Sequence, residues 1–318
     1  MTARPARPSG RGRRARADGV RIPDSVVRLG VRQLGRRVLN PELAWDVQRR
    51  RLERLLGASP LPKGTSVAGT VLNGVRAQVV SAGDAGTRPT VVHFHGGGYC
   101  VGSPRNALLW AAHLSARASC RVVLPEYRLA PGHPHPAALD DARAVMTALL
   151  YEAGRAQVVA SGDSAGGGLA LALLLGMRDE GGKLPAGCIL LSPWLDLGRD
   201  RRAEPRLVRR DVLLSPAWLD ACAAAYASPA DWSNPAVSPL RAHHGGLPPL
   251  LIQAGTDELL APDAEDLAAS ASSAGVDVTY TVWPRMWHDF ALQPGMLAAA
   301  DSALSQAAWF VDTVTAAD

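Results

Sequence analysis

Short apolar strands that alternate with alanine-rich helices are the feature that most restricts how this 318-residue chain can fold. The strands are expected at Thr90–His95, Arg121–Leu124, Gln157–Ser161, Cys188–Ser192, Pro249–Ala254 and Asp277–Val282. Because these strands are apolar throughout, both faces of their sheet must be covered. Helices are expected between and after them at 105–118, 136–152, 165–178, 262–274 and 297–314. The pattern predicts an α/β fold with a mostly parallel central sheet and helices on both faces.

Two further segments add to this core. The β-rich runs Ser66–Val71 and Val75–Ser81 are joined by Asn73-Gly74, a strong hairpin signal, and predict an antiparallel edge. Residues 199–239 stand between two strands and are too long for a plain connection. Since they include the helical stretch Pro216–Tyr226, we predict that they form a cap inserted over the sheet.

The chain is predicted to have three parts along its length. Residues 1–18 form a basic arm, residues 19–60 form N-terminal cap helices, and residues 61–318 form the catalytic domain with the cap insertion near 199–239. Apolar residues at helical spacing between Pro23 and Leu56 predict one or two amphipathic helices.

The positive charge is concentrated in the arm, which has six arginines and one aspartate and therefore carries +5. This equals the net charge of the whole chain, so the body is about neutral, which is not typical of nucleic-acid binding. After Met1 the arm has no apolar residue larger than alanine or proline, and it is expected to be disordered. With no apolar segment after the arm and no run long enough to span a membrane, we expect a cytoplasmic protein. Four widely separated cysteines show no metal-ligand spacing and are expected to be thiols, with no metal bound.

A serine between glycines follows one of the expected strands. Gly162-Asp163-Ser164-Ala165-Gly166 fits the Gly-x-Ser-x-Gly pattern. A nucleophile on such a sharp turn takes strained backbone angles, and the residues two before and two after it must lack side chains. A glycine-rich turn with a capping serine fits the five residues equally well. The strand before and the helix after favour Ser164 as a nucleophile.

A second glycine motif, His95-Gly96-Gly97-Gly98, closes another strand. Its glycines free the backbone N–H groups of Gly97 and Gly98 to point at one oxygen, and with the N–H of Ala165 they would form an oxyanion hole. A phosphate-binding loop is the alternative, but neither a P-loop lysine nor an acidic ribose partner follows.

A nucleophilic serine needs a base, and the base needs a carboxylate that orients it. His288 follows the last expected strand, in the chain order Ser, acid, His that a strand-to-helix nucleophile turn uses. Asp257 lies just past a strand end, where ligand-facing loops gather, and is the predicted acid. Glu258 and Asp263 are its rivals. His93 and His95 are expected to make structural hydrogen bonds.

At these residues the chain resembles the hormone-sensitive lipase-like branch (family IV) of bacterial esterases, in the α/β-hydrolase superfamily. The resemblance runs from about His93 to His288 and includes, in the same order, Tyr127–Pro131, Pro136–Asp141, Leu191–Trp194 and Asn234–Pro239. It implies the α/β-hydrolase fold, a Ser164–His288–Asp257 triad, an oxyanion hole of Gly97, Gly98 and Ala165, and a helical cap. After Asp257 this chain has Glu-Leu-Leu, where the family commonly has Pro-Leu-Arg.

The resemblance also implies hydrolysis of short-chain acyl esters without a cofactor. An amidase or deacetylase, or a lactone hydrolase of a secondary metabolite, would use the same triad. A non-catalytic small-molecule binder of the same fold is the third possibility. The expected partner is a small acyl ester, and a homodimer is possible. Tyr99, Asp163, Trp194 and Trp287 flank the motifs and are candidates for the substrate pocket, although core packing would explain the aromatic residues equally well.

Overall fold

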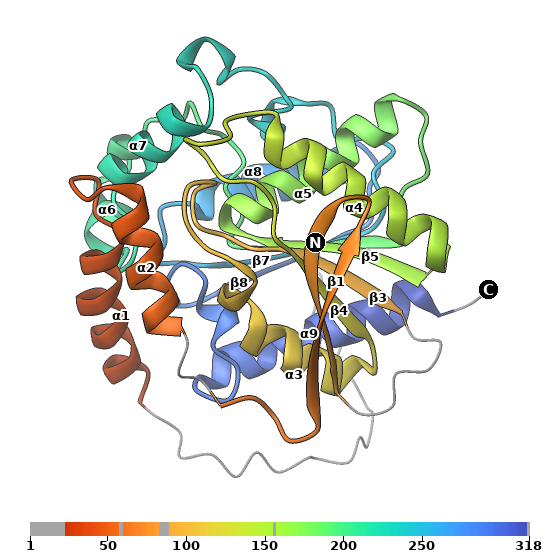
Figure 1. The fold of residues 1–318 in the computed structure, drawn as a ribbon. Helices are drawn as coiled ribbons and strands as arrows, with labels where there is room; N and C mark the ends of the chain where they lie inside the picture. The colour runs from red at the N-terminus through yellow and green to blue at the C-terminus, as the bar shows by residue number, and fades with distance from the viewer. Residues whose placement is uncertain (1–22, 57–59, 83–88, 155–156, 317–318) are drawn as a thin grey trace, which may run out of the picture.

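Eight strands form one sheet in the structure, a computed structural model that describes residues 23–56, 60–82, 89–154 and 157–316 (Figure 1). Their order across the sheet is β1-β2-β4-β3-β5-β6-β7-β8. The first two pairings are antiparallel and the remaining five are parallel. The strands are β1 (Thr65–Leu72), β2 (Val75–Ala82), β3 (Thr90–Phe94), β4 (Arg121–Pro125), β5 (Val158–Asp163), β6 (Gly187–Leu191), β7 (Leu250–Gly255) and β8 (Val278–Trp283).

The predicted fold class is therefore confirmed. Every residue of β3, β5, β6 and β7 is buried, as expected of strands covered on both faces. The hairpin between β1 and β2 turns at Asn73 and Gly74, both with positive φ. Strand β5 runs two residues further than predicted, to Asp163, because its pairing with β6 continues to Leu191.

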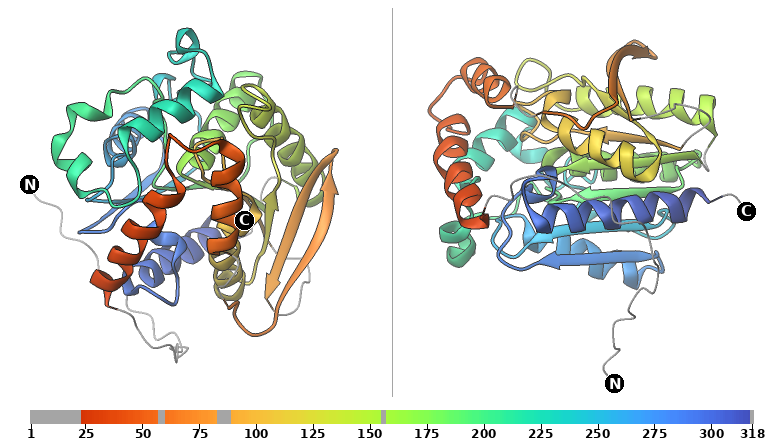
Figure 2. Two further views of the ribbon diagram at one scale, coloured as in Figure 1. Left: turned by 60° about the vertical axis from the view of Figure 1, so that its left-hand side comes forward. Right: turned by 90° about the horizontal axis from the view of Figure 1, so that it is seen from below.

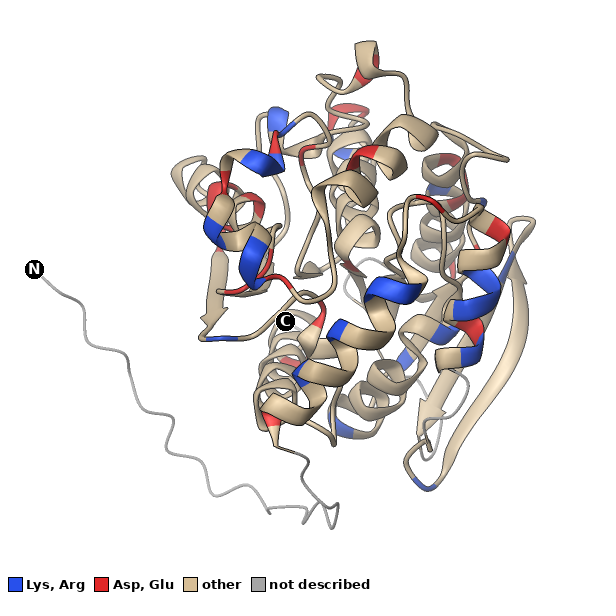
Figure 3. Cartoon of the chain, turned by 90° about the vertical axis from the view of Figure 1, so that its left-hand side faces the viewer, with Lys and Arg blue, Asp and Glu red and all other residues tan. Residues whose placement is uncertain are grey.

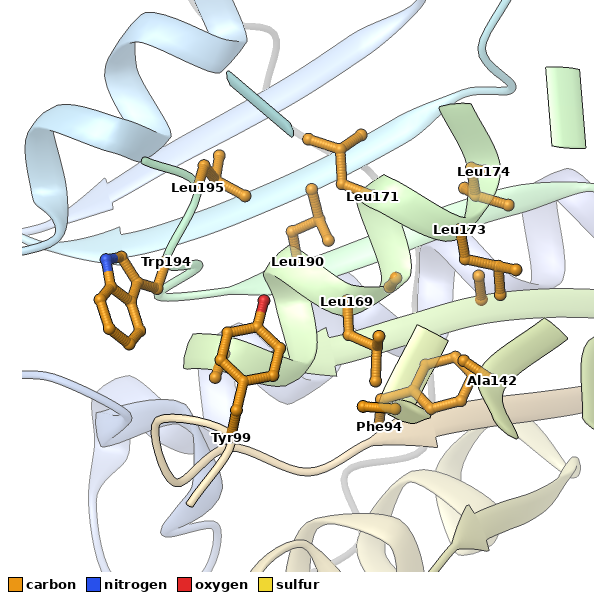
Figure 4. Packing of buried hydrophobic residues seen from close by; sticks show 14 of the residues in the cluster. Phe94, Tyr99, Ala142, Leu169, Leu171, Leu173, Leu174, Leu190, Trp194 and Leu195 are labelled. Atoms are coloured by element: carbon orange, nitrogen blue, oxygen red, sulfur yellow. The ribbon is translucent and has the colours of Figure 1, made fainter. Parts of the chain in front are cut away.

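Helices cover the two faces of the sheet in separate sets (Figures 1 and 2). Successive strand residues alternate between two apolar clusters: Ile189 and Leu191 belong to one, and Leu190 to the other. Figure 4 shows Phe94 and Leu190 packed with leucines of the helix that follows β5. One face holds α3 (Leu108–Ala118) and α9 (Ala298–Thr315), and the other holds α4 (Ala137–Ala153), α5 (Ser164–Asp179) and α8 (Ala261–Ser273).

Four more helices gather at the carboxyl ends of the parallel strands, on the left of Figure 1. They are α1 (Asp24–Val38) and α2 (Trp45–Leu56) from the N-terminal region, and α6 (Pro205–Arg210) and α7 (Pro216–Tyr226) from the connection between β6 and β7. The Trp218 indole N–H donates to Gln48 Oε1 at 2.9 Å and joins α7 to α2. The two segments predicted as cap thus lie side by side.

Short 3-10 helices complete the described elements: η1 (Pro104–Asn106), η3 (Arg201–Ala203), η4 (Pro229–Asp231), η5 (Pro239–Arg241) and η6 (Phe290–Leu292). Within the four described ranges, none of the helices combines the length and apolar character needed to cross a membrane. The predicted basic arm, residues 1–18, lies outside those ranges. All four cysteines are buried.

A buried ion pair holds the cap insertion to the body. Arg201 is 3% exposed and donates to both carboxylate oxygens of Asp263, at 2.7 and 2.8 Å. Asp263 Oδ2 also accepts the backbone N–H groups of Leu195 and Asp196. Asp263, a rival for the catalytic acid in the sequence, therefore organises the start of the insertion and has no contact with His288.

Replacing Arg201 by methionine should destabilise the protein by about 3 kcal/mol, because it leaves a buried carboxylate without its main cationic partner. The thermal midpoint should fall by roughly 5–10 °C. Arg202→Met is the matched control, since Arg202 is 57% exposed where it pairs with Asp220 and should contribute less than about 1 kcal/mol. Equal melting curves for the two variants would contradict this role of Arg201.

Candidate active site

Ser164 lies at the junction of β5 and α5, with φ of 52° in the left-handed region. That conformation is strained for a residue with a side chain and is typical of a nucleophile turn. A Cβ on Gly162 would overlap the carbonyl oxygen of Gly166, and one on Gly166 would overlap that of Phe94. The two glycines are therefore required by close backbone packing, as the sequence pattern predicts.

His288 contacts Ser164 directly. Its Nε2 lies 2.9 Å from Ser164 Oγ, and its Nδ1 lies 3.0 Å from Glu258 Oε2. The second carboxylate oxygen of Glu258 accepts the backbone N–H of Gly255 at 2.6 Å. Ser164, Glu258 and His288 are all buried. With Nδ1–H donating to the carboxylate, Nε2 is left to accept a proton from the serine.

The predicted acid, Asp257, is not the residue that contacts His288. Its carboxylate lies 3.1 Å from Arg28 Nη1 and 3.3 Å from Arg210 Nη1, so it faces the cap helices. The backbone N–H of Asp257 donates to the Met286 carbonyl, in the loop after β8. The chain already turns at Thr256 and Asp257, and the next side chain, Glu258, meets the imidazole.

Arg28 also ties α1 to the loop that carries His288. Its guanidinium donates to the carbonyls of Arg285 and Arg210, and it stacks over the ring of Trp287 at 5.9 Å from the centroid. Figure 3 views the molecule from the side of α1 and α2 and shows basic positions along both helices.

The glycine loop after β3 has unusual backbone angles at the predicted oxyanion-hole residues. Gly97 and Gly98 have φ of 116° and 60°, which favour glycine. Within the described part of the chain, the backbone N–H groups of Gly97, Gly98 and Ala165 have no protein acceptor. For Ala165 this follows from its place in the first turn of α5, where N–H groups have no intrahelical partner. Three donors are thus available near Ser164.

Asp163 and His93 lock the glycine loop against the nucleophile turn. Asp163 Oδ2 accepts the Gly96 N–H at 2.9 Å, and Oδ1 lies 2.9 Å from His93 Nε2. The other ring nitrogen of His93 is 2.9 Å from Ser161 Oγ. His95 Nδ1 lies 2.7 Å from the Gly96 carbonyl oxygen. The structural hydrogen bonds expected of His93 and His95 are confirmed.

A cavity of about 450 Å³ opens beside Ser164. Its walls are mostly apolar and come from both the cap and the body. The cap supplies Val27, Gly30, Val31, Leu34, Val38, Leu52, Leu55, Leu213, Leu214 and Trp218, and the body supplies Leu108, Leu109, Leu292 and Met296. The polar groups at its base include Asp163, Ser164, His288 and Asp289.

Of the four candidate pocket residues, only Asp163 lines this cavity. Tyr99 stacks on Tyr226 with ring centroids 3.8 Å apart, and Trp194 packs against Tyr99 in the core (Figure 4). Trp287 is buried beneath Arg28. These three aromatic side chains therefore take the packing role, and Trp218 is the aromatic residue of the cavity. The sequence did not assign any cavity residue to Pro23–Leu56, although the amphipathic pattern of this segment was the signal that could have identified it.

Charges near His288 favour its protonated form. Burial opposes that charge, but Asp289 and Glu258 more than offset the burial, so the pKa of His288 lies well above its usual range. Burial also raises the pKa of Asp211, whose carboxylate accepts the N–H of Leu259, next to Glu258. The site thus combines a buried serine, an imidazole that contacts it, a carboxylate behind that imidazole and three free N–H donors.

Comparison with known proteins places this arrangement in a family. Residues 91–292 match the model of a protein family whose description is alpha/beta hydrolase fold. A hormone-sensitive lipase from a metagenome library superposes with a TM-score of 0.87 at 33% identity, covering 93% of this chain and 99% of the other. An esterase from the bacterial hormone-sensitive lipase family gives a TM-score of 0.86 at 33% identity, over 92% and 100%. The chain belongs to the bacterial hormone-sensitive lipase family.

The family resemblance inferred from the sequence motifs is therefore confirmed. The chain is also 38% identical to an acetyl-hydrolase of Streptomyces hygroscopicus, over 71% of this chain and 76% of that protein. In this hormone-sensitive lipase family member, the residues that the structure brings together are Ser164, His288 and Glu258, with Asp257 turned to the cap.

Proposed function

We propose that the protein is a serine carboxylesterase that hydrolyses short-chain acyl esters through an acyl-enzyme on Ser164. That it is an ester hydrolase follows from its family, whose similar members are esterases and acetyl-hydrolases. The observation that carries the proposed chemistry is the 2.9 Å contact between Ser164 Oγ and His288 Nε2. This is the distance that a base needs to accept the serine proton.

The first half of the reaction forms the acyl-enzyme. Ser164 Oγ attacks the ester carbonyl carbon while its proton passes to His288 Nε2. The negative charge that develops on the carbonyl oxygen is bound by the N–H groups of Gly97, Gly98 and Ala165. When the C–O bond to the alcohol breaks, the proton on Nε2 moves to the alcohol oxygen, which leaves as a neutral molecule.

The second half returns the enzyme to its starting state. A water molecule gives a proton to His288 Nε2 and attacks the acyl carbon. The tetrahedral intermediate collapses, the acyl–Oγ bond breaks, and the proton on Nε2 passes back to Ser164. A carboxylic acid is released, and no cofactor is required.

Glu258 takes the role that the sequence assigned to Asp257. Its carboxylate accepts from His288 Nδ1, keeps the imidazole in the tautomer whose Nε2 faces the serine, and stabilises the imidazolium. The hydrogen bond from Gly255 N–H holds the other oxygen of Glu258, so the carboxylate cannot turn away.

The cavity supports an ester with an uncharged, apolar group. Its walls are formed mainly by aliphatic side chains, and a charged group placed among them would lose its hydration without a partner. Amide substrates would need the same proton transfers, but no feature of the described site favours them over esters.

Ser164→Ala should abolish hydrolysis of p-nitrophenyl acetate, with a loss of at least about 10³-fold in kcat. The wild-type protein should react with a fluorophosphonate probe, and the variant should not. Ser302→Ala, on the exposed side of α9, is the control and should keep full activity. A wild-type protein that neither hydrolyses esters nor reacts with the probe would instead be a non-catalytic binder.

Gly30→Phe should lower kcat/KM for p-nitrophenyl octanoate by about tenfold or more and change the acetate value by less than about threefold. Gly30 lines the cavity from α1, and a Cβ there meets nothing within 4 Å, so the phenyl ring can occupy the cavity without a backbone clash. Gly30→Ala is the matched control, since its methyl group leaves the cavity open and favours the helix. Equal losses on both esters would show that the long acyl group binds elsewhere.

A further inference from the structure

Asp289 is a carboxylate beside the reacting serine that the reaction described above does not use. It follows His288 directly and lines the same cavity. Its Oδ2 lies 3.2 Å from His288 Nε2, the nitrogen that also contacts Ser164 Oγ at 2.9 Å. Two groups therefore share one ring nitrogen: the serine hydroxyl and a carboxylate.

The backbone keeps the Asp289 side chain in this place. Asp289 has φ of 58°, in the left-handed region, and its N–H donates to Ser192 Oγ at 3.2 Å. Its carbonyl accepts the N–H of Leu292 and so begins η6. Among the described residues, its second oxygen, Oδ1, is buried and has no hydrogen-bond partner. A buried carboxylate oxygen without a partner is costly, which points to a function for this side chain.

No arginine or lysine in the described part of the chain forms an ion pair with Asp289. The charged groups that face it are His288 on its own loop, Asp163 at the end of β5 and Glu258 after β7. Asp211 acts on His288 from the cap, and Arg105 lies on the wall of the same cavity. Burial, together with the charges of Asp163 and Glu258, raises the pKa of Asp289 to about 7, although His288 opposes this rise.

We propose that Asp289 is a positioning residue that binds the proton-carrying Nε2 of His288 and thereby sets the pH above which the enzyme becomes active. The inference rests on the proposed function, because it concerns the imidazole that would act as the base. In the free enzyme the carboxylate holds the proton on Nε2, and an imidazole in that state cannot accept the proton of Ser164.

The same contact serves the reaction once it has begun. When Ser164 attacks, the proton arrives on Nε2, and the Asp289 carboxylate stabilises the imidazolium from the side facing the substrate. Glu258 stabilises it from the other side, through Nδ1. Asp289 thus raises the pH at which the enzyme becomes active, and above that pH it stabilises the charged imidazolium.

The test is Asp289→Asn, which keeps the size of the side chain, removes its charge and suits the left-handed backbone. The acid limb of the kcat/KM profile should move to lower pH by about one pH unit or more, because the imidazole without this carboxylate stays neutral to lower pH. On the high-pH plateau kcat should fall modestly, by about threefold to tenfold, because the imidazolium loses one partner. Asp312→Asn, an equal charge change on the exposed face of α9, should move neither quantity.

An unchanged acid limb in Asp289→Asn, or one that moves to higher pH, would overturn the inference. An NMR titration of His288, assigned by the loss of its signals in His288→Gln, tests it without an activity assay. The inference predicts a wild-type midpoint clearly above the ordinary value of about 6.5 and a lower midpoint in Asp289→Asn, because Glu258 remains and only the Asp289 charge is lost. Equal midpoints in the two proteins would contradict it. If the wild-type protein hydrolysed no ester, the proposed function would fail, while the comparison of the two titrations would still decide the role of Asp289.

Discussion

The hydrogen bond between His288 Nδ1 and Glu258 joins the loops that follow the last two strands of the sheet. It is the interaction on which the arrangement of the site depends, because an imidazole without a fixed partner at Nδ1 has neither a fixed tautomer nor a fixed direction. Gly255 holds Glu258 from below, and Asp211 binds the N–H of Leu259 from the cap. Each oxygen of the buried Glu258 carboxylate thus has a hydrogen-bond partner, the Gly255 N–H on one and His288 Nδ1 on the other.

Much of the fold and the centre of the site could be predicted from the sequence. The buried strands are apolar throughout, and Gly162 is required by contact with the backbone of Gly166 four residues later, so both features are local. Gly166, by contrast, is required by the carbonyl of Phe94 in the neighbouring strand, although the sequence pattern still marks it. The choice between Asp257 and Glu258 is not local. It depends on Arg28 and Arg210, two cap residues that draw Asp257 away from His288. A pattern that shows two adjacent carboxylates cannot reveal arginines that reach them from distant segments.

The residues that line the cavity also could not be predicted from local sequence. The amphipathic pattern of Pro23–Leu56 predicts helices with one apolar face, but not that this face lines a cavity together with residues far along the chain. Helix α1 supplies much of that wall and is tied by Arg28 to the loop of His288. Substrate binding and the placement of the imidazole are therefore connected through one helix. The aromatic residues nearest the motifs in sequence, Tyr99 and Trp194, pack in the core instead.

The paired variants Glu258→Gln and Asp257→Asn test the central claim most directly, through kcat on a short-chain ester. Each removes one negative charge and keeps the size of the side chain. If Glu258 orients His288, Glu258→Gln should lower kcat by on the order of 10³–10⁴, while Asp257→Asn should stay within about tenfold of the wild type. A collapse of activity in Asp257→Asn, with Glu258→Gln nearly unaffected, would contradict the account and return the role to Asp257.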